Sequence, residues 1–519
     1  MQRRDLILAG LSWPLLSPLA AALLAASPRA GAASTGMAFD DESVPAMAKA
    51  LAASPFRAPD ARLTPSLQKL GYDQYRALRF DPARALWRKA GLPFQAQFFH
   101  RGFLFQQRVD MHVVEAGRAM PLVYTPDMFT FGAATPPTEK DLGFAGFRLH
   151  TPLNNDAYYD EISAFLGASY FRGVGKGHIY GLSARGLALD TASATGEEFP
   201  VFKSFWLERP APGAAHAVVH ALLDSPSVAG AFRFAITPGV DTVMQVSMRL
   251  YPRKDLDQAG IAPLTSMYEF GANDRVGVDD FRPAVHDSEG LAMLSGSGQQ
   301  IWRPLHNPST LQESAFEDEN PRGFGLMQRK RSFEDFADSE AHYERRPSAW
   351  VEPIGDWGKG AVQLIEIPTA DEYHDNIVAF WRPAVALAAG REHRFDYRLH
   401  WCDQHVWKPA LAKVDATRIG AADAAEKAHT AAAVARRLVI IDFAGDVLRG
   451  QGEDAGIVPD VWASAGEVRN LVAHPLPATG GWRVGFELDP QHARAVELHA
   501  RLLRDGTAVS ETWLYRWTA

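Results

Sequence analysis

Short runs in which apolar and polar residues alternate recur along most of this chain. Examples are HAVVHALLD (216–224), TVMQVSMRLY (242–251), AVQLIEIP (361–368) and NIVAFW (376–381). An alternation of two residues places successive side chains on opposite faces of a strand. Gly, Pro, Asp and Asn between the runs form turns. The pattern predicts antiparallel β-sandwich structure, so the predicted fold class is all-β.

Helical periodicity is confined to a region near residues 41–90. The strings DDESVPAMAKALAAS (40–54) and LTPSLQKLGYDQYRALRF (63–80) have the spacing of short amphipathic helices. We therefore expect a few short helices there and strands elsewhere.

A change of composition divides the chain into two parts. Residues 401–437 are rich in Ala and poor in large apolar side chains, so they are predicted to be a linker, either a short helix or a flexible loop. The residues after it, 438–519, suffice for a small immunoglobulin-like sandwich. Those before it, 33–400, predict one large multi-stranded domain.

Residues 1–32 have the layout of an export signal. Arg3 and Arg4 precede an apolar stretch at 6–26, and small residues at 30–32 form a cleavage site. The paired arginines favour the twin-arginine route, which exports folded proteins. Two prolines interrupt the apolar stretch and favour cleavage over a membrane anchor, so we expect no stable membrane insertion.

Charge and cysteine content limit the partners of the chain. Its formal net charge of −8 gives no electrostatic footprint for nucleic acid. Cys402 is the single cysteine, so no intramolecular disulfide forms, and we interpret it as a small buried apolar side chain. Strand edges favour pairing between copies of a chain, so a homodimer is an open alternative to a monomer.

Residues 341–383 interleave aromatic rings with cations and carboxylates. Flat rings cover the apolar faces of sugars, and charged groups bond sugar hydroxyls. Carboxylates are the usual acid and base of glycosidic-bond chemistry. The segment therefore favours a carbohydrate site. An ordinary protein interface is the alternative, because Trp and Arg are also common there.

Longer strings along the whole chain resemble one family. They include QFFHRGF (97–103), YGLSARGLALDT (180–191), VHDSEGL (285–291), NPRGFGLMQR (320–329), WGKGAVQLIEIPT (357–369) and SETWLYRW (510–517). These strings resemble the periplasmic glucan biosynthesis proteins G and D, which act on osmoregulated periplasmic glucans with a β-1,2-linked glucose backbone. The twin arginine points to the D member.

The resemblance implies a large galactose-mutarotase-like β-sandwich with a long groove, followed by a small immunoglobulin-like domain. It also implies a periplasmic enzyme that hydrolyses β-1,2-glucan internally with inversion of the anomeric centre. A transglycosylase that cyclises or remodels the glucan is the first alternative, since some relatives transfer the cleaved chain. A non-catalytic glucan-binding scaffold is the second. We expect no metal and no other cofactor.

By this resemblance the general acid falls on Asp375, in YHDNIVAFW, and the general base on Asp287, in VHDSEGL. Asp375 stands just before a strand, although a turn pair with Asn376 is the alternative. Asp287 would equally suit an N-cap or Asx turn. An acid that donates near neutral pH needs a raised pKa, and Glu352 and Asp371 are candidates for a neighbouring carboxylate that raises it.

Seven further residues are predicted to contact substrate. Tyr343 is placed to hold a substrate hydroxyl or a relay water, with a packed surface tyrosine as the alternative. Each predicted arginine could instead be half of a structural ion pair. Glu366 is either a buried functional carboxylate or a sign of misjudged strand register. The other six predicted subsite residues are Arg346, Trp350, Glu352, Trp357, Arg172 and Arg185.

Overall fold

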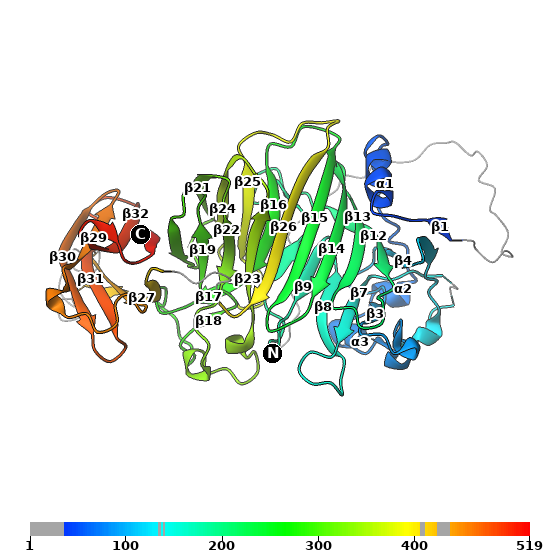
Figure 1. Cartoon of the computed structure of the whole chain (residues 1–519), viewed down its shortest axis with the longest axis horizontal. Helices are drawn as coiled ribbons and strands as arrows, with labels where there is room; N and C mark the ends of the chain where they lie inside the picture. Colours follow the sequence, from blue (N-terminus) through cyan, green and yellow to red (C-terminus); the bar gives the residue numbers. More distant parts are fainter. Residues whose placement is uncertain (1–35, 133–135, 139–140, 405–409, 423–435) are drawn as a thin grey trace.

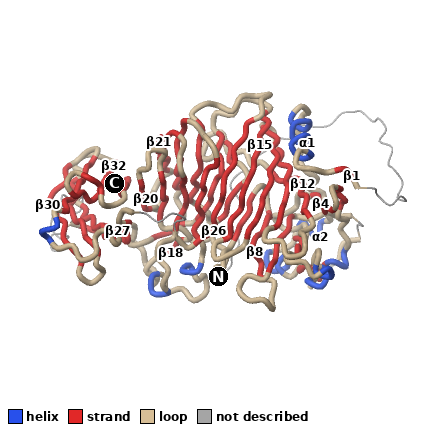
Figure 2. The backbone as a smooth tube through the Cα atoms, in the orientation of Figure 1, coloured by secondary structure: helices blue, strands red, loops and turns tan. Residues whose placement is uncertain are grey.

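The computed structural model describes residues 36–132, 136–138, 141–404, 410–422 and 436–519. This part of the chain is nearly all β, as Figure 2 shows, which confirms the predicted fold class. The predicted export signal lies outside the described residues.

Two large sheets face each other in the main body of the protein (Figure 1). Within the described residues, the larger sheet has sixteen strands, in the order β1 (Met37–Ala38), β5 (Arg118–Pro121), β4 (Asp110–Glu115), β12 (Val201–Glu208), β13 (Ala217–Asp224), β14 (Val228–Thr237), β15 (Thr242–Pro252), β26 (His393–Cys402), β23 (Ser348–Ile354), β22 (Gly323–Met327), β19 (Gly290–Leu294), β20 (Gln300–Pro304), β34 (Thr512–Thr518), β32 (Ala495–Arg504) and β29 (Ile457–Ala463), with β33 (Thr507–Ala508) beside β32.

The second large sheet has ten strands and three smaller sheets complete the described fold. The ten strands run in the order β21 (Gln312–Glu319), β24 (Lys359–Glu366), β25 (Ile377–Pro383), β16 (Ala259–Ser266), β10 (Ser183–Arg185), β9 (Tyr170–Gly173), β8 (Asp160–Leu166), β7 (Gly146–Thr151) and β3 (Gln95–Phe99), with β11 (Ala188–Leu189) beside β16. The smaller sheets are β17 (Tyr268–Phe270) with β18 (Val285–His286), β2 (Arg79–Phe80) with β6 (Phe129–Thr130), and the order β27 (Lys413–Ala421), β28 (Arg437–Ala444), β31 (Gly481–Asp489), β30 (Glu467–Leu476).

Aromatic side chains fill the space between the two large sheets. Phe147 on β7 meets Phe205 on β12 with ring centroids 4.9 Å apart, and Phe165 on β8 meets Phe234 on β14 at 5.2 Å. Arg148, the neighbour of Phe147 on β7, is partly exposed and pairs with Glu161. The alternation in the sequence therefore separates a buried face from a polar outer face.

Three short helices lie within the predicted region 41–90. They are α1 (Ser43–Ala52), α2 (Pro65–Gln68) and α3 (Tyr72–Arg76), and their presence confirms the prediction. Val44 and Ala48 of α1 are buried in an apolar cluster with Ala229 and Ala231 of β14. The helix thus covers part of the outer face of the sixteen-stranded sheet.

The C-terminal part of the chain forms a smaller sandwich from the four-stranded sheet and β34, β32 and β29. It begins with β27, a strand that lies inside the range 401–437 predicted as linker. The reason for the difference is composition, because the buried inner positions of β27 include Val414 and the small Ala416 instead of larger side chains. The linker residues 405–409 and 423–435 lie outside the described residues.

Cys402 and Glu366 are both fully buried in the structure. Cys402 is fully buried at the end of β26, and burial raises the pKa of its thiol. Glu366 ends β24, is fully buried, and bonds the Arg303 guanidinium and the His306 backbone N–H, each at 3.0 Å. The strand position expected for Glu366 therefore agrees with the structure. The hydrogen bonds to Arg303 and His306 compensate for the burial of its carboxylate.

Candidate functional site

The predicted acid and base lie in loops that lead into β19 and β25, next to the short strands β17 and β18 (labelled in Figure 1). Asp287 lies between β18 and β19, and Asp375 lies directly before β25. Burial raises the pKa of Asp375 and the charge of Asp287 raises it further, so the two carboxyl groups are electrostatic neighbours. The structure thus brings together two residues that are distant in the sequence.

Two adjacent residues, Met267 and Tyr268, hold both carboxylate-bearing loops. The Asp287 backbone N–H donates to the Met267 carbonyl at 2.9 Å. The Asn376 side chain accepts from the Tyr268 N–H at 2.8 Å and donates to the Tyr268 carbonyl at 2.9 Å. The Tyr268 ring stacks on His286 at 5.3 Å. Asn376 therefore supplies the loop contacts, and Asp375 is left to project from the loop.

Asp375 is accessible to solvent, yet protein atoms crowd its carboxyl group. This burial raises its pKa, and the nearby charge of Asp287 raises it further, against the opposing effects of Arg172 and Arg346. The neighbouring carboxylate is thus Asp287 instead of the predicted Glu352 or Asp371. A carboxyl group in this position retains a proton at higher pH than an ordinary Asp and is open to a ligand.

Asp287 is buried, and the guanidinium of Arg346 bonds its carboxylate. The same guanidinium lies 4.3 Å from the centroid of the Tyr343 ring. Tyr343 is 1% exposed, and its hydroxyl donates to Glu372 at 2.6 Å. Burial raises the pKa of Tyr343, so the hydroxyl keeps its proton. Arg346 is therefore half of an ion pair, but its partner is the predicted base.

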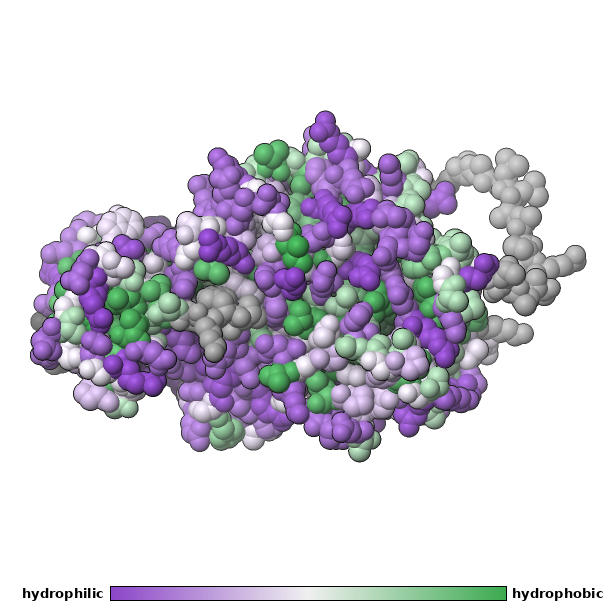
Figure 3. Space-filling model, viewed as in Figure 1, coloured by the Kyte–Doolittle hydropathy of each residue, from purple (hydrophilic) through white to green (hydrophobic). Residues whose placement is uncertain are grey.

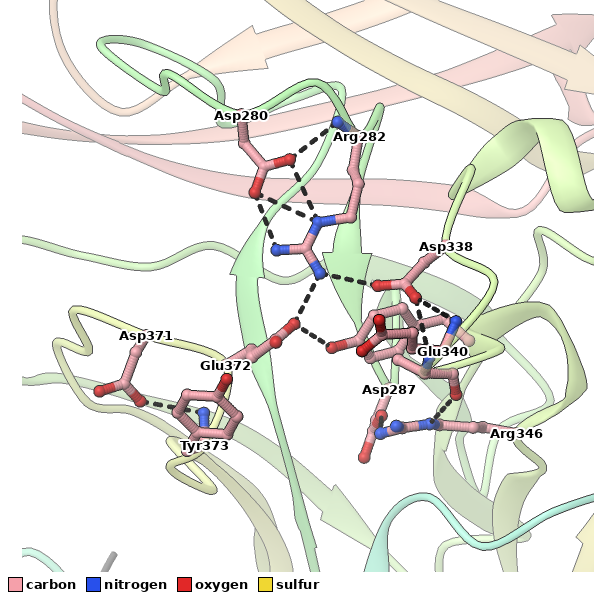
Figure 4. A network of polar contacts seen from close by, with 11 residues as sticks. Asp280, Arg282, Asp287, Asp338, Glu340, Arg346, Asp371, Glu372 and Tyr373 are labelled. Carbon is pink, nitrogen blue, oxygen red and sulfur yellow. Dashed lines mark hydrogen bonds and ion pairs between the residues drawn. The ribbon is translucent and has the colours of Figure 1, made fainter. Parts of the chain in front are cut away.

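Glu372 belongs to a polar network that the sequence interpretation missed. Arg282 donates to Asp280 at 2.8 Å, to Asp338 at 2.8 Å and to Glu372 at 2.7 Å (Figure 4). Glu269 lies nearby, and burial, followed by the charge of Glu372, raises its pKa to about 7. No local signal distinguished Glu372 from the acidic residues beside it, because its partner Arg282 lies 90 positions upstream.

The two predicted arginines of β9 and β10 differ in their surroundings. The Nε of Arg172 donates to Ser183 at 2.7 Å, and its charge lowers the pKa of Asp375, so Arg172 lies beside the acid. Arg185 is 2% exposed and bonds Glu197 at 2.5 Å. Arg185 thus forms the structural ion pair that was left open as its alternative.

The structure does not bring the predicted tryptophans to these carboxylates. Trp350 is 1% exposed and belongs to the apolar cluster shared with the C-terminal sandwich. Trp357 is 6% exposed and packs edge-on against Phe395. A buried ring offers no face to a sugar, so these two do not form the predicted subsite wall here. Glu352 bonds His400 at 3.0 Å on the outer face of β23.

Among the described residues, Asp41, Glu208 and His220 converge closely enough to hold a metal ion. His216 and His220 have the spacing HxxxH, but they lie on extended chain, where residues four apart are separated by about 13 Å. The Nε2 of His220 already bonds Glu208 at 2.6 Å, and Asp41 pairs with Arg233 at 3.3 Å. We therefore assign no metal to this group.

The fold and the site define an all-β protein in which two carboxyl groups lie near each other at one end of a sandwich. The family model described as periplasmic glucan biosynthesis protein, MdoG, matches residues 39–517. The chain belongs to this family, which confirms the family resemblance predicted from its sequence strings.

Curated relatives are similar over nearly their full lengths. The chain is 55% identical over 499 residues to glucans biosynthesis protein G of Rhodopseudomonas palustris, covering 96% of this chain and 97% of that protein. Identity to the protein of the same name is 51% over 507 residues in Bradyrhizobium diazoefficiens (97% and 99% covered) and 50% over 491 residues in Vibrio cholerae (94% and 88% covered). These relatives carry the G name, so assignment to the D member stays a prediction that rests on Arg3 and Arg4.

Among the helices in the part of the chain that the structure describes, none is long and apolar enough to cross a membrane.

Proposed function

We propose that this protein acts in periplasmic glucan biosynthesis as an inverting enzyme that hydrolyses β-1,2-glucan internally. The family and the names of the curated relatives support the glucan as substrate. The observation that supports catalysis is that adjacent residues, Met267 and Tyr268, hold the loops of Asp287 and Asp375 together at one end of the sandwich. Inverting hydrolysis needs a protonated carboxyl for the leaving oxygen and a carboxylate that takes a proton from water.

The surroundings of the two carboxyl groups support different roles for them. The raised pKa and solvent access of Asp375 suit a general acid. The contact with Arg346 orients the carboxylate of Asp287, which suits a general base. Tyr343 is buried and its ring packs against the Arg346 guanidinium, so it is suited to position Arg346 and, through it, Asp287. Glu372 fixes the direction of the Tyr343 hydroxyl.

One experiment tests the proposal against both alternatives. Purified protein is incubated with linear β-1,2-glucan, and the products are followed by size and by anomeric proton NMR. Shorter linear products with inverted ends support hydrolysis, whereas cyclic or longer products indicate a transglycosylase. Binding without any change in the polymer, by wild type and by Asp375→Asn alike, would show that the protein is a scaffold.

We propose that residues 1–32 direct this protein through the twin-arginine route into the periplasm. The support is the sequence alone, with Arg3 and Arg4 ahead of an apolar stretch. A variant with both arginines replaced by lysine should remain in the cytoplasm as the uncleaved precursor. Cell fractionation and the mass of the exported chain test this, and unchanged export of the variant would contradict it.

We propose a homodimer through the edge strands of the C-terminal sandwich. β29 and β30 are the last strands of their two sheets and lie next to each other. Both carry apolar side chains that are exposed in the single chain. Figure 3 shows apolar surface on this part of the molecule. Sedimentation velocity should give a dimer for wild type and a monomer for Val472→Lys, and a wild-type monomer contradicts the proposal. The exposed apolar residues of the two strands are Val458, Trp462, Leu471 and Val472.

A further inference from the structure

A cavity of about 550 Å³ opens between residues 103–108, the β8–β9 turn at 166–168 and residues 199–205. Its lining is largely apolar and aromatic, with Phe103, Leu104, Phe105, Tyr170 and Phe199 among the side chains. A lining of this kind with a few polar groups at its rim is typical of small-ligand sites. Gln107, whose side chain is exposed, supplies an amide at the rim.

Phe199 is the exposed ring of this cavity. It is 48% exposed, a large apolar area to leave in contact with water. The guanidinium of Arg185 lies 5.0 Å from the centroid of the Phe199 ring and 5.2 Å from that of Tyr170. Arg185 is itself buried and bound to Glu197, so its planar guanidinium is held in a fixed position against both rings.

The side chains of the two residues before Phe199 are also held by hydrogen bonds. Glu197 accepts a hydrogen bond from the Thr191 hydroxyl at 2.7 Å. Glu198 accepts from the backbone N–H of Ser227 at 3.0 Å and from its hydroxyl at 2.6 Å. An exposed ring on so constrained a segment is organised before any ligand arrives, which lowers the entropic cost of binding.

The cavity and the candidate site both adjoin β9. Tyr170, in the cavity wall, and Arg172, beside Asp375, are two residues apart on the same face of this strand, about 7 Å along it. Arg185 lies opposite Tyr170 on β10. Burial raises the pKa of Tyr170 and the charge of Asp375 raises it further, so the tyrosine lies near the acid.

We infer that this cavity is a distal subsite of the enzyme, in which the Phe199 ring packs against the apolar face of a glucose unit remote from the cleaved bond. This inference rests on the proposed function, since it takes β-1,2-glucan as the ligand. A short oligosaccharide bound across Asp375 does not reach Phe199, whereas a longer one does. Phe199 therefore makes the affinity of the protein depend on chain length.

The test measures binding of β-1,2-linked glucose oligosaccharides of increasing length by isothermal titration calorimetry. The full mature chain carrying Asp375→Asn serves as parent, so that ligands are not consumed. Phe199→Ala is expected to raise Kd about tenfold for the longer oligosaccharides and to leave the shortest that bind unchanged. Phe199→Tyr, which keeps the ring, should bind as the parent does. Phe199→Leu keeps apolar bulk without a flat face, and should behave like Phe199→Ala.

Three results would overturn the inference. They are an unchanged Kd of Phe199→Ala for every length, an equal weakening at all lengths, and a Phe199→Leu variant that binds as tightly as the parent. Failure of the proposed reaction looks different, because wild type would then bind glucan without cleaving it while the length-dependent effect of Phe199→Ala persisted. Absence of binding at every length by both wild type and parent overturns the subsite and the proposed function together.

Discussion

Asp375 combines two properties at the scale of a single residue, access to solvent and a raised pKa. Its neighbour Asp287 is buried and bonded to Arg346 instead. Different surroundings around two carboxyl groups are the arrangement by which enzymes divide acid and base roles. The sequence strings indicated both residues through the family resemblance, but not how each is surrounded, because burial and charge neighbours come from distant segments.

Replacement of Asp375 by Asn removes the acidic proton and keeps the size of the side chain. If Asp375 is the general acid, kcat on β-1,2-glucan should fall ~10²-fold or more. In wild type the activity should decline as pH rises through the raised pKa, because the ionised carboxylate has no proton to donate. Initial rates across the pH range measure both effects, and the residual activity of the variant should lack this decline.

Asp371→Asn is the matched control for this loop. Asp371 bonds His374 at 2.7 Å and is more than a third exposed, and it has no proposed part in proton transfer. Its substitution should leave kcat within about threefold of wild type, since surface pairs contribute little. A fall in kcat as large as that of Asp375→Asn would show that both variants act by disturbing the loop.

For Glu269 we predict an effect of pH on the stability of the protein instead of on its activity. Its pKa rises from 4.5 to about 7 on folding, so the folded protein disfavours the charged form. The resulting destabilisation is absent below about pH 4.5, grows as pH rises, and is complete above about pH 7. Glu269→Gln should therefore raise Tm relative to wild type at about pH 8 and leave it unchanged at about pH 4. Thermal unfolding followed by circular dichroism tests this, and an equal shift at both pH values contradicts it.

At the scale of elements, alternation located the long strands well. The runs at 361–368 and 376–381 became β24 and β25, and the helical pattern near 41–90 became three short helices. The β17–β18 ribbon was not predicted, because strands of two or three residues are too short to show a period. Yet this ribbon positions both carboxylates, so the sequence indicated the residues of the site without the element that joins them.

The interpretation of Trp350 failed for a reason that also belongs to this scale. Along β23, Ala349 and Val351 face the core between the two large sheets, and Trp350 and Glu352 face the other side. Alternation does not say what covers the outer face of the sheet. There the C-terminal sandwich buries the ring of Trp350, while Glu352 stays partly exposed. Local pattern specifies a face, and only tertiary packing decides whether that face meets solvent.

Asn376→Ala tests the link between β17 and the loop that carries Asp375. The substitution removes the side-chain hydrogen bonds to the Tyr268 N–H and carbonyl and to the Ile367 carbonyl. A buried backbone group left unpaired costs about 1–3 kcal/mol, so urea unfolding should show a loss of that order. Because Asp375 then loses its fixed position, kcat should fall more than KM changes. Full activity in a variant of reduced stability would contradict the positioning role.

At the scale of the whole molecule, the two sandwiches share one sheet. β20 of the large sandwich pairs in parallel with β34 of the small one, so Ile301 lies opposite Thr512 and Trp302 opposite Trp513. An apolar cluster with Trp302, Met327 and Trp350 continues into the C-terminal core. Composition predicted a change of domain within residues 401–437. It gave no sign of this joint, since pairing between distant strands leaves no local pattern.

A buried ion pair connects the two sandwiches at this joint. From it we predict how the two sandwiches unfold. Glu511 of the small sandwich accepts two bonds from the Arg329 guanidinium, at 2.5 and 3.1 Å, and that guanidinium lies 3.5 Å from the centroid of Trp302. Both side chains are 6% exposed, so Glu511→Gln removes the carboxylate charge that this buried cation bonds and should cost about 3–5 kcal/mol.

The loss of stability should weaken the attachment of the C-terminal sandwich, because Glu511 also accepts a hydrogen bond from the backbone N–H of Val414 in β27, at 2.5 Å. Differential scanning calorimetry of Glu511→Gln should therefore show the C-terminal sandwich unfolding in a separate transition below that of the main body. The matched control is Glu497→Gln, which breaks the more exposed pair with Arg516 on β34 and should cost less than about 1 kcal/mol. If the two variants unfold alike, in one unshifted transition, the buried pair does not hold the domains together and the shared sheet alone must do so.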